Sequence, residues 1–211
     1  MNLSDKNLND IIIRYNERYR QYGYSEKSLG WTKNKQDIRF NVLTEMIKED
    51  NFSILDIGCG FGDINRVLHC RFKNYQYTGI DIIEAFIEEG KKRYSSSDVE
   101  FVTGDFLKYK FVKKYDYIVA SGIFNHQLSD QSNYEYFESV TEKSIQLARK
   151  SISFDFLSDK VDYRLENTFH NSPETILSIA YLFSRRIILR NDYMPFEFSI
   201  TINKQDSFSS D

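Results

Sequence analysis

One stretch, Ile54 to Asp63 with the sequence ILDIGCGFGD, restricts the possible folds of this 211-residue chain more than any other. A short apolar run bounded by polar residues is typical of a buried parallel strand. Three glycines follow it, at positions 58, 60 and 62, and a helical pattern begins at Ile64. A strand, a glycine turn and a helix in this order predict a nucleotide-binding βαβ unit, because glycine accepts positive φ and lets a ligand approach the backbone.

The spacing of these glycines separates two classes of nucleotide site. A dinucleotide fingerprint, Gly-x-Gly-x-x-Gly, would place its last glycine at residue 63, where this chain has Asp63, and the third glycine is Gly62 instead. The motif D-I-G-C-G-F-G, from Asp56 to Gly62, resembles the first motif of class I S-adenosylmethionine (SAM) dependent methyltransferases. The resemblance implies that Asp56, Gly58 and Gly60 bind the cofactor SAM, which leaves as S-adenosylhomocysteine.

An acidic residue, Asp81, ends the second predicted strand, 76–80. A carboxylate at this strand end, in register with the glycine turn, can accept hydrogen bonds from both ribose hydroxyls. In the resembled family this position carries the acidic residue of the second motif, and Ile82 beside it would pack on the adenine. The alternative is that Asp81 only caps the next helix, predicted over 82–94.

A Gly-Asp pair follows the third predicted strand, residues 99–102, and resembles the family's third motif. The resemblance implies that Asp105 accepts a hydrogen bond from the exocyclic amine of adenine and that Phe106 lines the ring pocket. The alternative is a simple turn, in which an Asp after Gly is common.

The fourth predicted strand, residues 115–120, is followed by Ser121 and a loop that reaches His126. Ligands of open α/β sheets bind outside the carboxyl ends of the strands, so we expect Ser121 to contact the cofactor and His126 to face the reacting centre. His126 is a candidate general base, and the alternative is a substrate-contacting or exposed histidine. Asn125 and His170 are candidate substrate contacts, the latter in the irregular stretch 157–171 that is long enough for a substrate-binding insertion.

The segment 1–33 is predicted to form a helical flap. Apolar residues recur at helical spacing over 5–22, and the loop that follows carries Tyr24 and Trp31. In the resembled family this segment often closes over the cofactor, which assigns Trp31 to the cofactor and Tyr24 to the substrate wall; the alternative is simple packing against the domain. Arg39, in a second predicted helix over 34–49, could bind the methionine carboxylate of SAM or form a structural salt bridge.

Composition and motifs argue against several classes of function. The net charge is −3, so no general attraction to nucleic acid is expected, and the loop after the fourth strand lacks the [Asp/Asn/Ser]-Pro-Pro-[Tyr/Phe] signature of amino-group methyltransferases acting on nucleic acid. The two cysteines, 59 and 70, have no CxxC spacing, and no residue cluster predicts a metal site. Neither a signal peptide nor an apolar run long enough for a bilayer is evident, so we expect a cytoplasmic protein without membrane partners.

These patterns predict an α/β fold: a Rossmann-like, seven-stranded methyltransferase sheet, mostly parallel with an antiparallel last strand and helices on both faces. The flap would span 1–33, the methyltransferase domain 34–204 and a frayed tail 205–211. We expect a monomer or homodimer that moves a methyl group to an O or N atom of a small molecule, with a sugar or sugar-linked metabolite as one candidate. The alternatives are a nucleotide-binding oxidoreductase and a non-catalytic SAM-binding protein. Further helices are predicted from Ile64 to about residue 72, over 131–149 and over 172–183. Further strands are predicted over 151–156, 186–190 and 196–202.

Overall fold

A seven-stranded sheet forms the centre of the computed structural model, which describes residues 2–31 and 35–204. The strands are ordered β3-β2-β1-β4-β5-β7-β6, and β7 alone runs antiparallel to its two neighbours in this sheet. This confirms the predicted mostly parallel sheet with an antiparallel last strand. The strands are β1 (Phe52–Ile57), β2 (Tyr75–Asp81), β3 (Val99–Thr103), β4 (Tyr115–Ala120), β5 (Ala148–Leu157), β6 (Ile187–Arg190) and β7 (Glu197–Asn203).

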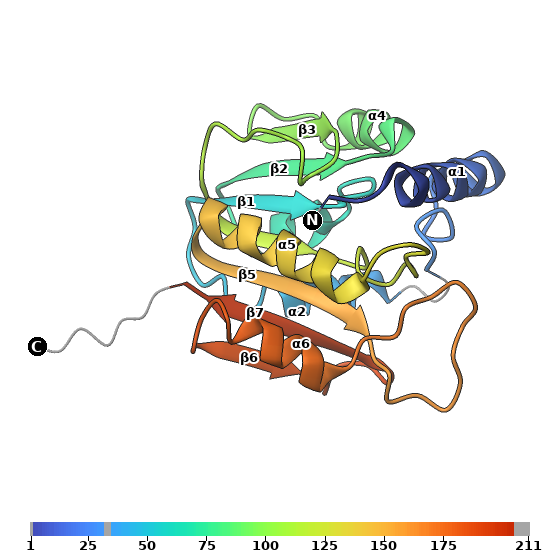
Figure 1. Cartoon of the computed structure of the whole chain (residues 1–211). Coiled ribbons are helices and arrows are strands. Elements are labelled where there is room, and N and C mark those ends of the chain that lie inside the picture. Colours follow the sequence, from blue (N-terminus) through green and yellow to red (C-terminus); the bar gives the residue numbers. More distant parts are fainter. Residues whose placement is uncertain (1, 32–34, 205–211) are drawn as a thin grey trace, which may run out of the picture.

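Helices cover both faces of the sheet, as expected for parallel strands that are buried on both sides. One core lies between the sheet and the helices α5 and α6, which cross the front of Figure 1, and a second core lies between the sheet and α2, α3 and α4. The helices are α1 (Asp5–Tyr22), α2 (Gln36–Leu43), α3 (Ile64–Arg71), α4 (Glu84–Arg93), α5 (Asn133–Leu147) and α6 (Pro173–Ala180).

The structure differs from the predicted element bounds mainly at two places. The helix expected over 34–49 ends at Leu43, because the carbonyls of Thr44 and Ile47 accept hydrogen bonds from the Arg71 guanidinium instead of continuing the helix. β5 begins at Ala148, where the prediction still had helix. The predicted tail 205–211 lies outside the described residues.

Helices α1 and α6 each begin with a serine that caps the first turn. The Ser4 hydroxyl accepts a hydrogen bond from the Asn7 N–H at 3.1 Å, and the Ser172 hydroxyl accepts one from Thr175 at 3.2 Å, with Pro173 at the first position of α6. Such caps satisfy N–H groups that have no partner within the helix.

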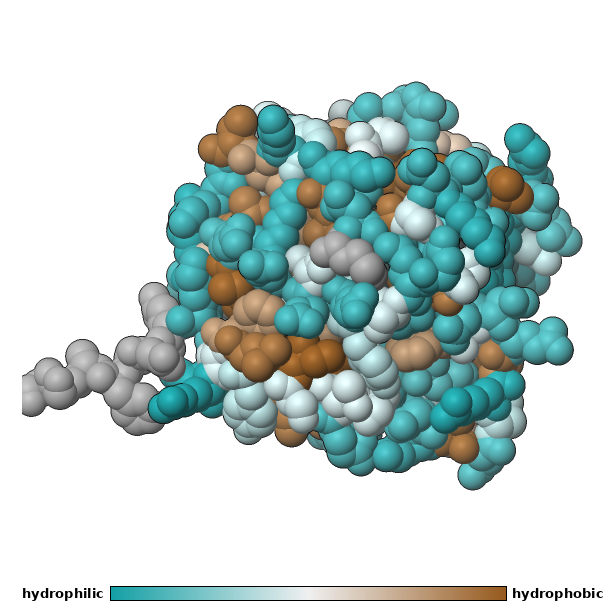
Figure 2. Space-filling model, in the orientation of Figure 1, coloured by the Kyte–Doolittle hydropathy of each residue, from teal (hydrophilic) through white to brown (hydrophobic). Residues whose placement is uncertain are grey.

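The outer surface is mostly hydrophilic on the face shown in Figure 2, where apolar residues form separate patches. Over residues 2–31 and 35–204, no helix is both long and apolar enough to cross a membrane. Both cysteines are free thiols, Cys59 buried and Cys70 exposed.

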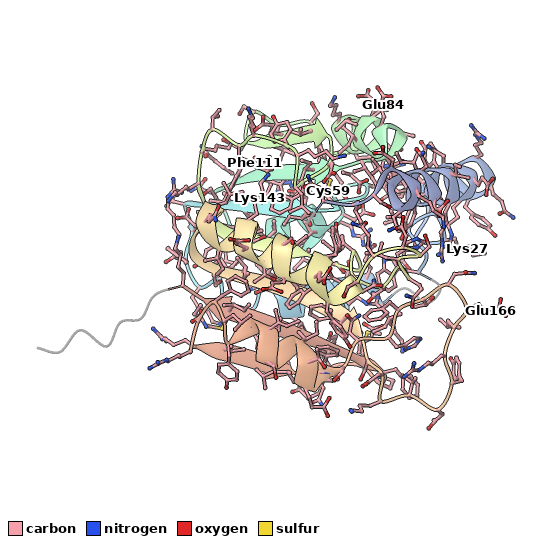
Figure 3. The ribbon with its side chains drawn as sticks, in the orientation of Figure 1. Lys27, Cys59, Glu84, Phe111, Lys143 and Glu166 are labelled. Carbon is pink, nitrogen blue, oxygen red and sulfur yellow. The ribbon has the colours of Figure 1, made fainter. Side chains whose placement is uncertain are left out.

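α1 lies at the end of the sheet toward which the arrowheads of β1, β2 and β5 point (Figure 1). The loop after α1 and the loop after β5 reach the same end of the molecule, as Lys27 and Glu166 show in Figure 3. The carboxyl ends of the parallel strands are therefore covered by segments from opposite parts of the chain.

Candidate active site

A pocket lies at the carboxyl ends of β1, β2 and β4. Three carboxylates predicted to converge from neighbouring strands, those of Asp56, Asp81 and Asp105, all line it. Of the other predicted site residues, those that line the pocket are Gly58, Gly60, Ile82, Phe106, Ser121, Trp31 and His126.

The glycine turn is packed so closely that two of its glycines have no room for a side chain. Gly58 has φ +65°, and a Cβ there would lie 2.3 Å from Cγ2 of Ile123. Gly60 has φ +55°, and its Cβ would lie 2.8 Å from Cδ2 of Leu29. The turn thus requires glycine both for its backbone angle and for its contacts with the loops above it.

Asp81 has two structural partners in addition to its place in the pocket. Its Oδ2 accepts a hydrogen bond from the Gly60 N–H at 2.8 Å, and its Oδ1 accepts one from the Ile83 N–H at 2.9 Å. Burial raises the pKa of Asp81 to about 6, while these backbone donors oppose the rise. Each oxygen keeps a second lone pair, so the carboxylate can still accept hydrogen bonds from a ligand.

Asp105 presents one oxygen that no described residue satisfies. Its Oδ1 accepts a hydrogen bond from the Leu107 N–H at 2.9 Å, whereas Oδ2 is buried and has no hydrogen-bond partner. Lys108 Nζ lies 3.9 Å from Oδ2, too far for a hydrogen bond. An unpaired acceptor that lines a pocket is a strong sign of a donor supplied by a ligand.

The loop that carries Asp105 is held by Lys143 of α5, a residue that the sequence reasoning missed. Lys143 Nζ donates hydrogen bonds to the carbonyls of Phe106, Leu107 and Tyr109 at 2.6, 2.9 and 2.7 Å. Figure 3 shows Lys143 beside this loop, next to Phe111. A cation that caps three carbonyls fixes the position of the loop.

Asp56 lies at the end of β1, deep in the pocket floor. It is 4% exposed, and its Oδ2 accepts a hydrogen bond from the Tyr77 hydroxyl at 2.9 Å. Burial raises the pKa of Asp56 to about 8, and the neighbouring Asp81 and Asp155 add to the rise. The carboxyl group is therefore harder to ionise than an exposed carboxyl group.

The predicted flap forms the roof of the pocket. Leu3, Ile11 and Tyr15, at the start of the chain and on α1, line it together with Leu29 and Trp31 of the loop that follows. Both α1 and the loop after it therefore contribute residues to the pocket.

A buried asparagine holds α1 in place over the pocket. Asn7 is 1% exposed; its Nδ2 donates to Asp130 Oδ1 at 2.6 Å, and its Oδ1 accepts from the Ser129 N–H at 2.9 Å. Ser4 adds a hydrogen bond from its hydroxyl to the same Asp130 oxygen at 2.9 Å. These contacts connect the start of the chain to the loop that precedes α5.

Arg39, predicted to bind the cofactor, instead forms the structural salt bridge that was its alternative. Its Nε donates to Glu197 Oε2 at 2.7 Å, and its Nη2 donates to the other carboxylate oxygen. Both side chains are buried, and Trp31 stacks on the guanidinium with 3.9 Å to the ring centroid. Arg39 does not line the pocket; it supports Trp31, which does.

The three predicted substrate residues are not among those that line the pocket. The Tyr24 hydroxyl donates to Asp63 Oδ1 at 2.7 Å, which fastens the flap to the glycine turn. Asn125 Oδ1 accepts from the Leu157 N–H at 2.8 Å, and His170 Nδ1 lies 2.8 Å from the Ser158 carbonyl oxygen. Each of these side chains takes part in a hydrogen bond between separate segments of the chain.

His126 does line the pocket and contacts the roof. Its Nδ1 lies 3.2 Å from Arg14 Nη1, which also donates to the Asn167 carbonyl at 3.3 Å. The His126 carbonyl accepts from Asn133 Nδ2 at 2.7 Å, and the residue pairs with Thr168 as an isolated bridge. Burial and then Arg14 lower the pKa of His126.

Asp155 on β5 is a second residue that the sequence reasoning missed. It is 2% exposed; its Oδ2 accepts from the Ser121 hydroxyl at 2.5 Å and its Oδ1 from the Gly122 N–H at 2.7 Å. Burial raises the pKa of Asp155 to about 6. In the sequence, the only sign of a buried role for Asp155 was its place between apolar residues on a predicted strand. That pattern did not reveal that its carboxylate binds the loop after β4.

Known proteins similar to this chain are methyltransferases. Residues 54–144 match a family model described as a methyltransferase domain. A protein of Mycobacterium tuberculosis named as a methyltransferase is 27% identical over 161 residues, which are 74% of this chain and 95% of that protein. The malonyl-acyl-carrier-protein O-methyltransferase of Acetivibrio thermocellus is 34% identical over 87 residues, 40% of this chain, and the match spans only 31% of that enzyme.

A solved structure shares the fold over almost the whole chain. The magnesium protoporphyrin IX methyltransferase of Synechocystis PCC 6803, crystallised with SAM, superposes with a TM-score of 0.68 at 15% identity and covers 97% of this chain and 100% of its own. At this identity the likeness shows the architecture alone.

Proposed function

We propose that this chain, whose residues 54–144 match a methyltransferase domain, is a class I SAM-dependent methyltransferase that transfers the methyl group of SAM to an oxygen or nitrogen atom of a small molecule bound under α1. The observation that carries the proposal is the convergence of the glycine turn and the carboxylates of Asp56, Asp81 and Asp105 on one roofed pocket. The acceptor would occupy the part of the pocket between the roof and His126.

The residues present fit the adenosyl group. The unpaired Asp105 Oδ2 is an acceptor for the exocyclic amine of adenine, and Phe106 and Ile82 supply apolar walls for the ring. The free lone pairs of Asp81 suit the ribose hydroxyls. The absence of a Cβ at Gly58 and Gly60 leaves the turn close to the ligand.

SAM supplies a methyl group already activated by a sulfonium, so the protein need not create an electrophile. What this chain contributes is alignment and the exclusion of water, and positioning supplies about 7–11 kcal/mol of the barrier in favourable cases. Water would be excluded by the roof, which is formed by Leu3, Ile11, Tyr15, Leu29 and Trp31. Its apolar lining favours an acceptor with an apolar body over a polyhydroxylated sugar, which would require many hydrogen-bonding partners.

The geometry of Asp63 argues against the oxidoreductase alternative. Where a dinucleotide fingerprint has its last glycine, Asp63 is 4% exposed and accepts hydrogen bonds from the hydroxyls of Tyr24 and Tyr94, both at 2.7 Å. In a dinucleotide fingerprint the last glycine allows close packing of the helix on the strand, and a buried aspartate held by two tyrosines does not have that role.

Titration calorimetry with SAM and with NAD, followed by incubation with methyl-labelled SAM and a bacterial metabolite extract, tests the proposal. We expect heat from SAM, none from NAD, and transfer of label to a small molecule. Heat from NAD alone would support the oxidoreductase, and SAM binding without any transfer would support a non-catalytic SAM-binding protein.

A further inference from the structure

The hydrogen bond between Arg14 and His126 fixes the position of the imidazole proton. A guanidinium has only donors, so the Nδ1 of His126 at 3.2 Å from Arg14 Nη1 must be the acceptor. In the neutral ring the proton then sits on Nε2, which pairs with no described residue. Because the ring lines the pocket, Nε2–H is the group left for a bound molecule.

His170 has the opposite tautomer for an equally simple reason. Its Nδ1 lies 2.8 Å from the Ser158 carbonyl, which can only accept, and its Nε2 accepts from the Leu165 N–H at 3.4 Å. The two histidines thus provide an internal contrast, with the proton on Nε2 in His126 and on Nδ1 in His170.

We propose that His126 acts as a hydrogen-bond donor to the acceptor substrate, and that this substrate is a carboxylate on an apolar body, which the enzyme converts to a methyl ester. The proposal rests on the methyl transfer inferred above and names the class of acceptor. In it His126 touches the substrate, and Arg14 acts through His126 as a positioning residue.

The acceptor side of the pocket lacks a group suited to remove a proton. Burial raises the pKa of the Tyr15 and Tyr136 hydroxyls, and the Ser121 hydroxyl already donates to Asp155. With Nδ1 paired and Nε2 protonated, His126 has no lone pair for the substrate. An alcohol or ammonium acceptor would need a base, whereas a carboxylate with a pKa of about 4 is nucleophilic at neutral pH as it stands.

The charges beside His126 also favour an anion. Arg14 forms no ion pair with any described residue, so its positive charge is uncompensated at close range. The one carboxylate whose charge acts on His126 to raise its pKa is that of Asp10, an exposed residue on α1, the helix that also carries Arg14. Among the described residues of the roof there is no carboxylate that could hold an ammonium group. A single cation next to one N–H donor suits one carboxylate better than a phosphate dianion.

The reaction balances without proton transfer. A lone pair of the carboxylate oxygen forms the new O–CH3 bond, and the S–CH3 bond breaks with its electron pair going to sulfur. The products are a neutral methyl ester and the thioether S-adenosylhomocysteine. Transfer to an alcohol or an ammonium would release one proton for each methyl group.

Alkali lability of the product tests the class of acceptor. The full chain is incubated with tritiated-methyl SAM and a bacterial metabolite extract, and half of each product is treated with mild alkali, which frees volatile methanol from esters but not from ethers, amines or phosphodiesters. We expect most of the transferred label to become volatile. Label that is transferred but alkali-stable overturns the carboxylate proposal and leaves methyl transfer intact, whereas failure to bind SAM overturns the proposed function itself.

Nitrogen NMR decides the tautomer and the ligand class even where no label is transferred. The chain has only three histidines, so the ring signals of the protein with S-adenosylhomocysteine can be assigned by H69Q, H126Q and H170Q. We expect Nε2–H for His126 and Nδ1–H for His170. Octanoate should shift the His126 signals and 1-octanol should not. An Nδ1–H tautomer for His126, equal shifts from both probes, or no shift from either would overturn the proposal.

Substitutions at positions 126 and 14 distinguish a hydrogen-bond donor from a general base. Gln at position 126 can donate from its amide but cannot take up a proton, so H126Q should keep about tenfold more kcat/KM than H126A. R14Q should allow both tautomers of His126 in the NMR spectrum and lower kcat/KM by about tenfold. Equal losses in H126Q and H126A, with a pH profile that disappears in both, would identify a general base and overturn the proposal.

Discussion

The buried Asp56 predicts an unusual pH dependence of stability, which Asp56→Asn should remove. Asn is isosteric and can still accept the Tyr77 hydroxyl hydrogen bond through its side-chain oxygen. Burial raises the pKa of Asp56 from 3.8 to about 8. Between these values the folded protein holds a proton that the unfolded chain has lost, so this group makes the free energy of unfolding fall as pH rises.

The magnitude follows from the size of the shift. At about 1.4 kcal/mol per pKa unit, the interval from pH 5 to pH 8 corresponds to about 4 kcal/mol, an upper limit because water penetration softens burial. Urea unfolding of ligand-free wild type and D56N at pH 5, 6, 7 and 8 measures it. The difference should be small at pH 5 and should grow in favour of D56N toward pH 8.

The control for this experiment is Asp98→Asn at an exposed position before β3, where the difference from wild type should not vary with pH. A wild type that gains stability relative to D56N as pH rises would show that Asp56 is ionised and stabilised in the fold. That result would refute the argument from burial.

Three further outcomes are expected. D105N keeps the acceptor for the Leu107 N–H but turns the unpaired oxygen into a donor, so SAM should bind about tenfold more weakly by calorimetry with unchanged stability; unchanged affinity would remove Asp105 from the adenine site. Gly122 has φ +79°, and a Cβ there would lie 2.7 Å from Trp31 Cζ2, so G122A should lower the free energy of unfolding by about 1–2 kcal/mol and weaken SAM binding. A Cβ at Gly104 would lie 3.6 Å from its nearest neighbour, Tyr109 Cδ2, so the control G104A should change neither quantity. N7A should lower stability by about 1–3 kcal/mol and expose the loop after α1 to protease, and N16A on the same helix should leave the cleavage pattern unchanged.

The floor of the pocket could be predicted from the sequence because it is built from local patterns. A short strand followed by glycines, or ending in Asp, fixes the place of Asp56, Asp81 and Asp105 once the strands are parallel. The antiparallel last strand was expected from the resemblance to the methyltransferase sheet, whereas the order of the strands was not predicted. In these regions the residues that interact are either neighbours in sequence or at equivalent ends of adjacent strands.

The rest depends on pairs that are far apart in the chain. Arg39 was assigned to the cofactor because its partner Glu197 lies 158 residues away and no local pattern connects them. The partner of His126 is Arg14, 112 residues earlier, and this pairing rather than the residue type sets which nitrogen carries the proton. Tyr24 likewise has a distant partner that no local pattern reveals, since its hydroxyl donates to Asp63, 39 residues later.

The floor and the roof of the pocket come from different parts of the chain. Asp56, Asp81 and Asp105 lie within residues 54–144, the segment shared with the methyltransferase domain, while Leu3 and Trp31 of the roof precede it. If the chain acts as proposed, changes in the segment from Leu3 to Trp31 would alter which molecule is modified without changing Asp56, Asp81 or Asp105.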